Sequence, residues 1–193
     1  MIIVDVETTG QDPRKNAIIS IGAVDFNNPE NTFYEECCIW DKAEIDDKAL
    51  EINGFSKDKL NDQTKRSEVV LLTEFLTWAD KCKSKIIAGN NCWFDWYFLY
   101  YAVQRYPYLE WIISHRVIDL HSLCYAHHLK RKIKLPEKLI PDLILKYVVL
   151  HEEPKPHNAL TGAKMEAEAF SRLLNGKNLI KEFEKYPIPT YLL

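Results

Sequence analysis

The sequence lacks the features of a membrane or secreted protein. No stretch approaches the roughly 20 consecutive apolar residues that a membrane-spanning helix needs. The N-terminus enters a strand-like apolar run, IIV, without the basic-then-apolar layout of a signal peptide. We therefore expect a cytoplasmic protein with no membrane partner.

Cysteine is scarce and lacks the regular spacing of a metal site or a disulfide framework. The five cysteines are scattered along the chain at Cys37, Cys38, Cys82, Cys92 and Cys124. We expect reduced thiols, with the last three filling the core.

The sequence also lacks repeats, linkers and a strong charge of one sign. Its net charge is −3, which is weak evidence against a nucleic acid partner, because clustered acids that hold cations would hide a local positive site. With 47% hydrophobic and 27% charged residues in 193, the composition is that of one globular domain.

The order of the expected elements predicts an α/β fold. Strand-like segments come first, and helical periodicity then alternates with two short strands. The expected strands cover residues 1–6, 17–26, 32–40, 85–89 and 116–119. The expected helices cover residues 46–53, 66–81, 92–105, 120–129, 136–148 and 158–174. This order favours a mixed sheet, antiparallel in its first part, with helices on its faces.

The stretch DVETTG places two carboxylates near the end of the first strand. Asp5 and Glu7 point to the same face because side chains alternate along a strand. A divalent cation between them would remove their repulsion, and oxygen ligands favour Mg²⁺ or Mn²⁺. Alternatively, Asp5 caps the turn and Glu7 is solvated.

Two further motifs carry polar residues at the starts of helices. Asp95 lies in an aromatic run behind Asn90 and Asn91, which could cap the helix or contact phosphate. His157 opens the last helix, where it could accept a proton from water. Alternatively, Asp95 is a helix N-terminal acid favoured by the macrodipole, and His157 is a surface residue or a cap.

Together the three motifs resemble the DnaQ-like family of 3′→5′ exonucleases, in its histidine-containing (DEDDh) branch. Asp5 to Gly10 match the first motif, D-x-E-T-T-G, in full. Asn91, Phe94 and Asp95 match the second motif, which is close to H-N-x-x-F-D. His157 and Ala159 match the third, H-x-A-x-x-D. The resemblance covers residues 1–174 and leaves 175–193 as a tail that packs on the domain or docks a partner.

The resemblance implies a ribonuclease H-like fold with a mixed five-stranded sheet. It implies a phosphodiester hydrolase that releases nucleoside monophosphates from single-stranded 3′ ends of DNA or RNA. Two Mg²⁺ or Mn²⁺ ions would be held by Asp5, Glu7 and Asp95, and His157 would be the general base. The implied substrate contacts are Thr8, Thr9, Gly10, Phe55 and Asn91. A polymerase partner or a homodimer is compatible with the sequence.

The chain departs from the third motif at Gly162, where the family has a carboxylate that shares a metal with Asp5 and Glu7. This predicts one metal or none and impaired hydrolysis. Glu166 lies one turn further along the helix and is the neighbour that could replace this carboxylate. Its side chain would have to reach back about one turn, ~5.4 Å, which is long. A silent protein that binds nucleic acid ends on the same fold is the alternative function. Gly162 could instead serve a close helix-to-sheet contact.

A run of basic residues follows His127. The run is a solvated face, or it guides the backbone of a single-stranded nucleic acid toward the acidic residues. Its members are Lys130, Arg131, Lys132, Lys134 and Lys138.

Overall fold

A computed structural model of the chain describes residues 1–62 and 64–193. Its described strands form one five-stranded sheet in the order β3-β2-β1-β4-β5. Neighbouring strands β1, β2 and β3 are antiparallel, whereas β4 and β5 run parallel to β1. The strands are β1 (Ile2–Thr8), β2 (Ile18–Asp25), β3 (Thr32–Glu36), β4 (Ile87–Gly89) and β5 (Val117–Asp119). The predicted mixed five-stranded sheet is confirmed.

Seven α-helices follow or connect these strands in the described part of the chain. They are α1 (Asp47–Asn53), α2 (Lys57–Leu60), α3 (Glu68–Lys81), α4 (Trp93–Gln104), α5 (Leu120–Arg131), α6 (Pro141–Tyr147) and α7 (Ala159–Asn175). Two short 3₁₀ turns, η1 (Lys181–Phe183) and η2 (Thr190–Leu192), lie in the C-terminal segment. None of the helices in these ranges is long and apolar enough to cross a membrane.

Several predicted boundaries were wrong at the ends of elements. The third strand ends at Glu36 rather than at residue 40, and α6 starts at Pro141 rather than at residue 136. Pro141 occupies the first turn of α6, a position where the missing N–H of proline costs nothing. The helix α2 was not predicted, because four residues are too few to show a period. Of the two roles considered for Asn90 and Asn91, capping of α4 is not found, since Cys92 is its N-cap residue.

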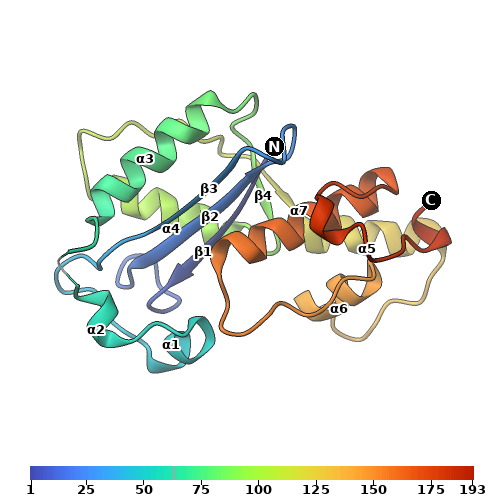
Figure 1. Ribbon diagram of the computed structural model, residues 1–193, viewed down its shortest axis with the longest axis horizontal. Coiled ribbons are helices and arrows are strands. Elements are labelled where there is room, and N and C mark those ends of the chain that lie inside the picture. The colour runs from blue at the N-terminus through green and yellow to red at the C-terminus, as the bar shows by residue number, and fades with distance from the viewer. Residues whose placement is uncertain (63) are drawn as a thin grey trace.

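Helices cover both faces of the sheet (Figure 1). Because side chains alternate along a strand, those of β1 divide between the two helical layers. Ile2, Val4 and Val6 pack in the cluster that includes α3 and α4. Ile3 belongs to the cluster on the opposite face, with α5, α6 and α7. Asp5 and Glu7 therefore project from the face that α7 covers.

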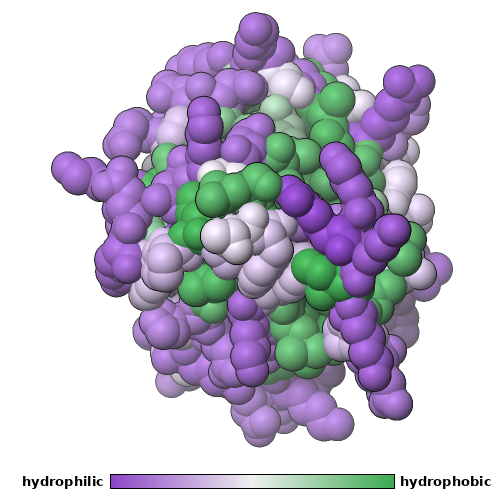
Figure 2. All heavy atoms as spheres, turned by 90° about the vertical axis from the view of Figure 1, so that its right-hand side faces the viewer, coloured by the Kyte–Doolittle hydropathy of each residue, from purple (hydrophilic) through white to green (hydrophobic). Residues whose placement is uncertain are grey.

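The C-terminal segment packs back on α7, at the end of the molecule that Figure 2 faces. There, hydrophobic side chains gather near the middle of the face, with hydrophilic ones around them. The hydroxyl of Tyr191 donates to the carbonyl of Tyr147 at 2.6 Å, and Leu192 is 4% exposed. The division of the chain after residue 174 stays a prediction, although these contacts tie the segment to the domain.

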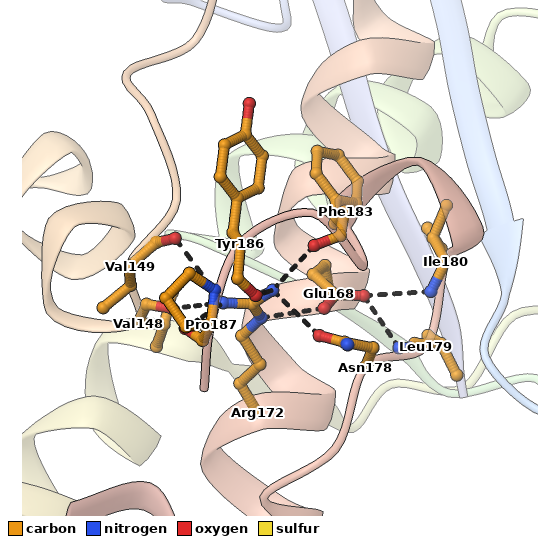
Figure 3. Close-up of polar contacts among 10 residues, drawn as sticks. All are labelled: Val148, Val149, Glu168, Arg172, Asn178, Leu179, Ile180, Phe183, Tyr186 and Pro187. Atoms are coloured by element: carbon orange, nitrogen blue, oxygen red, sulfur yellow. Dashed lines mark hydrogen bonds and ion pairs between the residues drawn. The ribbon is translucent and has the colours of Figure 1, made fainter. Parts of the chain in front are cut away.

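Arg172 of α7 anchors this segment from a fully buried position (Figure 3). Its guanidinium pairs with Glu168 at 2.8 Å and also donates to backbone carbonyls and one amide oxygen. The shortest of these other contacts are with Val148 O, Asn178 Oδ1, Phe183 O and Tyr186 O. Glu168 in turn accepts from the N–H groups of Leu179 and Ile180. Both charges are thus satisfied inside the protein.

Replacing Arg172 by methionine should destabilise the fold strongly. The change leaves the Glu168 carboxylate buried without its partner, a loss of about 3–5 kcal/mol in the free energy of unfolding. Lys164→Met on the same helix is the control, because the Lys164–Glu182 pair is exposed and pairs of this kind contribute about 0–1 kcal/mol. Urea unfolding followed by circular dichroism measures both, and equal effects would contradict the anchoring role of Arg172.

Candidate active site

A pocket of about 300 Å³ lies between the end of β1 and the start of α7. Asp5 and Glu7 line it from β1, Gly162 and Glu166 line it from α7, and His157 lines it from the position before the Asn158 cap. Asn158 caps α7 by accepting from the N–H groups of Leu160 and Thr161, which fixes the position of the histidine that precedes it. Residues far apart in the sequence thus meet in one cavity.

Two glycines let α7 approach the sheet at this point. A Cβ at Gly22 of β2, which pairs with Asp5, would lie 2.1 Å from the backbone of Ala159. A Cβ at Gly162 would lie 2.0 Å from Oδ2 of Asp5. The close helix-to-sheet contact that the sequence left open at Gly162 is therefore present, and the Asp5 carboxylate occupies the space.

The carboxylates in and around the pocket are crowded. Burial and then the charges of Glu166 and Asp95 raise the pKa of Asp5 well above its ordinary value. Burial and the nearby Glu153 carboxylate raise the pKa of Glu7 to about 7. Burial likewise raises the pKa values of Glu153 and Glu166. Repulsion and desolvation therefore oppose full ionisation of the group.

Asp95 lies beside this pocket, outside its lining. It is 5% exposed, and its Oδ1 accepts from the N–H of Val6 at 3.0 Å. Burial raises its pKa to about 8, although the hydrogen bond from Val6 acts in the opposite direction. The helix α4 thus holds Asp95 directly against β1, close enough for its charge to act on Asp5.

Glu153 is a pocket residue that sequence reasoning missed. It lies in the irregular segment before α7, and its Oε2 is 3.5 Å from Nδ1 of His157. Glu7, Glu153 and His157 each offer a ligand atom within 4.8 Å of the other two. A carboxylate four residues before the histidine was visible in EEPKPH, but an irregular segment shows no periodicity that would orient it.

The residues predicted to contact substrate are spread more widely than the residues that line the pocket. Thr9 is buried, and its N–H and hydroxyl already donate to the carbonyls of Ala17 and Glu44. Thr8 Oγ1 donates to the Gly10 carbonyl at 2.6 Å. Phe55 packs beside the small cluster of Ile19, Leu50 and Leu60. The substrate roles of these residues stay predictions.

Asn91 lines a second hollow. It adjoins the pocket lined by Asp5, Glu7, Glu153 and Glu166, called the acidic pocket from here on. Asn90 and Pro141 line both, and Trp93, 44% exposed, lines the second. The N–H of Asn91 donates to Asp119 at 2.9 Å, a side chain that also caps α5. Single-stranded chains bind in grooves of this kind by stacking on aromatic rings.

The donor set fits a divalent cation. Glu7 is 8% exposed, and one of its carboxylate oxygens lies within 4.8 Å of a Glu153 carboxylate oxygen and a His157 ring nitrogen. Oε1 of Glu153 and Oε2 of Glu166 are buried and have no hydrogen-bond partner in the described ranges. Buried carboxylates are stable when paired or bound to metal, and oxygen-rich sites select hard cations such as Mg²⁺ and Mn²⁺.

Without a divalent cation, the protein should lose stability as the pH rises. The folded state binds protons more tightly than the unfolded state at these carboxyls, so the free energy of unfolding falls from the unfolded pKa values near 4 up to about 8. Mn²⁺ should therefore raise the melting temperature more at pH 8 than at pH 5. Thermal scans with EDTA or Mn²⁺ test this, and a Mn²⁺ effect that is equal at both pH values would contradict it.

Comparison with known proteins agrees with this geometry. Residues 2–170 match the RNase T family model, described as exonuclease. The chain is 30% identical over 190 residues to a DNA polymerase III PolC-type protein of Thermotoga maritima. That match covers 95% of this chain and 13% of the polymerase, so the chain spans only a small part of this relative.

Solved structures share the fold. The nuclease domain of 3′hExo, described as a DEDDh family member bound to rAMP, has a TM-score of 0.70 at 18% identity and covers 93% of this chain and 94% of its own. E. coli exonuclease I in complex with a dA16 oligonucleotide has a TM-score of 0.72 at 18% identity, covering 91% and 40%. The predicted ribonuclease H-like exonuclease fold is confirmed. The chain belongs to the RNase T family of exonucleases.

Proposed function

We propose that this chain removes nucleoside monophosphates from single-stranded 3′ ends of DNA or RNA. The observation that carries the proposal is the single pocket that joins Asp5 and Glu7 of β1 to His157 before α7. A cluster of carboxylates and a histidine at one cavity are the elements of metal-assisted phosphodiester hydrolysis. Family membership supports the reaction class.

Each residue has a distinct role in this proposal. Asp5 and Glu7 would hold a Mg²⁺ or Mn²⁺ pair, with Asp95 supporting it from α4. Such ions, when bound, neutralise the phosphate and acidify water. His157 would take the proton from the attacking water. Glu153, 3.5 Å from Nδ1 of His157, would orient the ring.

The second hollow supports single-stranded substrates. It continues from the acidic pocket past Asn90 and Pro141 to Trp93. A terminal nucleotide in the pocket would leave the next base near this exposed ring. A strand end fits this arrangement, whereas a paired duplex would have its bases stacked on one another.

The absence of a carboxylate at residue 162 favours a second candidate function. A protein of this fold that binds 3′ ends without cleaving them would also use the pocket and the hollow. The sequence predicted impaired hydrolysis for this reason, and that prediction stays open to experiment. The two functions differ in whether bound ends are shortened.

Digestion of oligonucleotides labelled at the 5′ or the 3′ end separates these functions. With Mn²⁺, we expect early release of the 3′ label as a mononucleotide and a ladder that shortens from the 3′ end. Asp5→Asn should abolish both. Internal cuts first, or release from the 5′ end, would contradict the polarity, and tight binding without any cleavage would favour the silent protein.

Replacing His157 by alanine should lower the cleavage rate by roughly 10²–10⁴-fold, the usual contribution of a general base. Binding of single-stranded ends should change little, because the carboxylates and the second hollow remain. His115→Ala, at an exposed position outside both hollows, is the control. Single-turnover kinetics with fluorescence anisotropy measures the two effects, and an equal loss in both variants would contradict the assignment.

A further inference from the structure

Glu166 lies one helical turn beyond Gly162 and points into the acidic pocket. The two residues share a face of α7, because positions four apart on a helix lie one above the other. Helical side chains also lean toward the N-terminus, which directs Glu166 back toward Gly162. Both line the pocket together with Asp5.

Two glycines make room for this carboxylate. A Cβ at Gly89, the last residue of β4, would lie 3.0 Å from Oε2 of Glu166. At Gly162 the space that a side chain would fill is taken by Oδ2 of Asp5. The absence of both side chains therefore allows the Asp5 and Glu166 carboxylates to face the same cavity.

The Glu166 carboxylate interacts with the backbone N–H of Asn90 and, among the described residues, keeps one oxygen free for a ligand. Its Oε2 is buried and has no hydrogen-bond partner within residues 1–62 and 64–193. No lysine, arginine or histidine in these ranges forms an ion pair with it, and its charge acts directly on Asp5. By contrast, the buried Glu168 on the same helix is fully paired with Arg172 and two N–H groups. A cation would stabilise this buried oxygen, which no protein group contacts by a hydrogen bond in the described ranges.

We propose that Glu166 supplies the carboxylate that residue 162 lacks, and that it ligates a divalent cation together with Asp5. The proposal deepens the proposed function, on which it rests for its place in catalysis. It also gives Gly162 a purpose, since any side chain there would displace Asp5. The chain would then keep a four-carboxylate centre made of Asp5, Glu7, Asp95 and Glu166.

Binding of Mn²⁺ to the whole chain, without nucleic acid, tests this by calorimetry and by electron paramagnetic resonance. Glu166→Gln keeps the shape and should weaken Mn²⁺ at least tenfold. Glu166→Asp keeps the charge but shortens the reach, and should also weaken it several-fold. Glu152→Gln removes the same charge from an exposed neighbouring position and should bind as the wild type does.

Folding is checked by melting temperature in EDTA, where Glu166→Gln should be at least as stable as the wild type, because it removes a repelling carboxylate. Wild-type Mn²⁺ affinity in Glu166→Gln would overturn the proposal, and so would wild-type affinity in Glu166→Asp, which would leave only a distant charge effect. If Glu153→Gln lost Mn²⁺ affinity and Glu166→Gln did not, the proposal would also be overturned, because the ligand would then be Glu153.

The Mn²⁺-binding result for Glu166 does not depend on whether the chain cleaves nucleic acid. An inert wild-type chain whose Mn²⁺ binding depends on Glu166 would contradict the exonuclease and support the ligand. An active chain in which Glu166→Gln leaves Mn²⁺ affinity unchanged would support the exonuclease and overturn the ligand.

Discussion

Repulsion among carboxylates around Asp5 is the constraint on which the site depends. The charges of Glu166, Asp95, Glu7 and Glu153 all act on this one residue. They come from α7, α4, β1 and the segment before α7, so folding itself brings them together. A fold that gathers acids that repel one another in this way is destabilised until a cation binds. The rest of the domain offsets this destabilisation. The two packed helical layers and the Arg172 contacts in the C-terminal half of α7 contribute to this offset.

The fold brings α7 close enough to complete this site. Gly22 and Gly162 remove the side chains that would separate the helix from β1 and β2. The same contact explains why a helix interior tolerates glycine at residue 162, although glycine costs about 1 kcal/mol there relative to alanine. Glycine at residue 162 therefore permits close packing of α7 on the sheet and leaves the space that the Asp5 carboxylate occupies.

Much of this arrangement could be predicted from the sequence, and the rest could not for physical reasons. Strand alternation placed Asp5 and Glu7 on one face, and strand order gave the mixed sheet. Element ends at residues 36 and 141 depended on pairing and on proline, which periodicity does not show. Glu153 lies in an irregular segment, where spacing carries no direction. Whether the Glu166 side chain lies in the same pocket as Asp5 depended on how closely α7 approaches the sheet. This is a tertiary property that helical periodicity does not predict.

The central claim is that a metal centre persists here without a carboxylate at residue 162. A crystal structure of the chain grown with Mn²⁺, with the metal located by its anomalous scattering, tests it most directly. We predict a peak with oxygens of Asp5 and Glu166 within ~2.6 Å, the longest distance usual for oxygen ligands of the larger Ca²⁺ ion. A peak without Glu166 in that range, or no peak in the pocket at saturating Mn²⁺, would contradict the account.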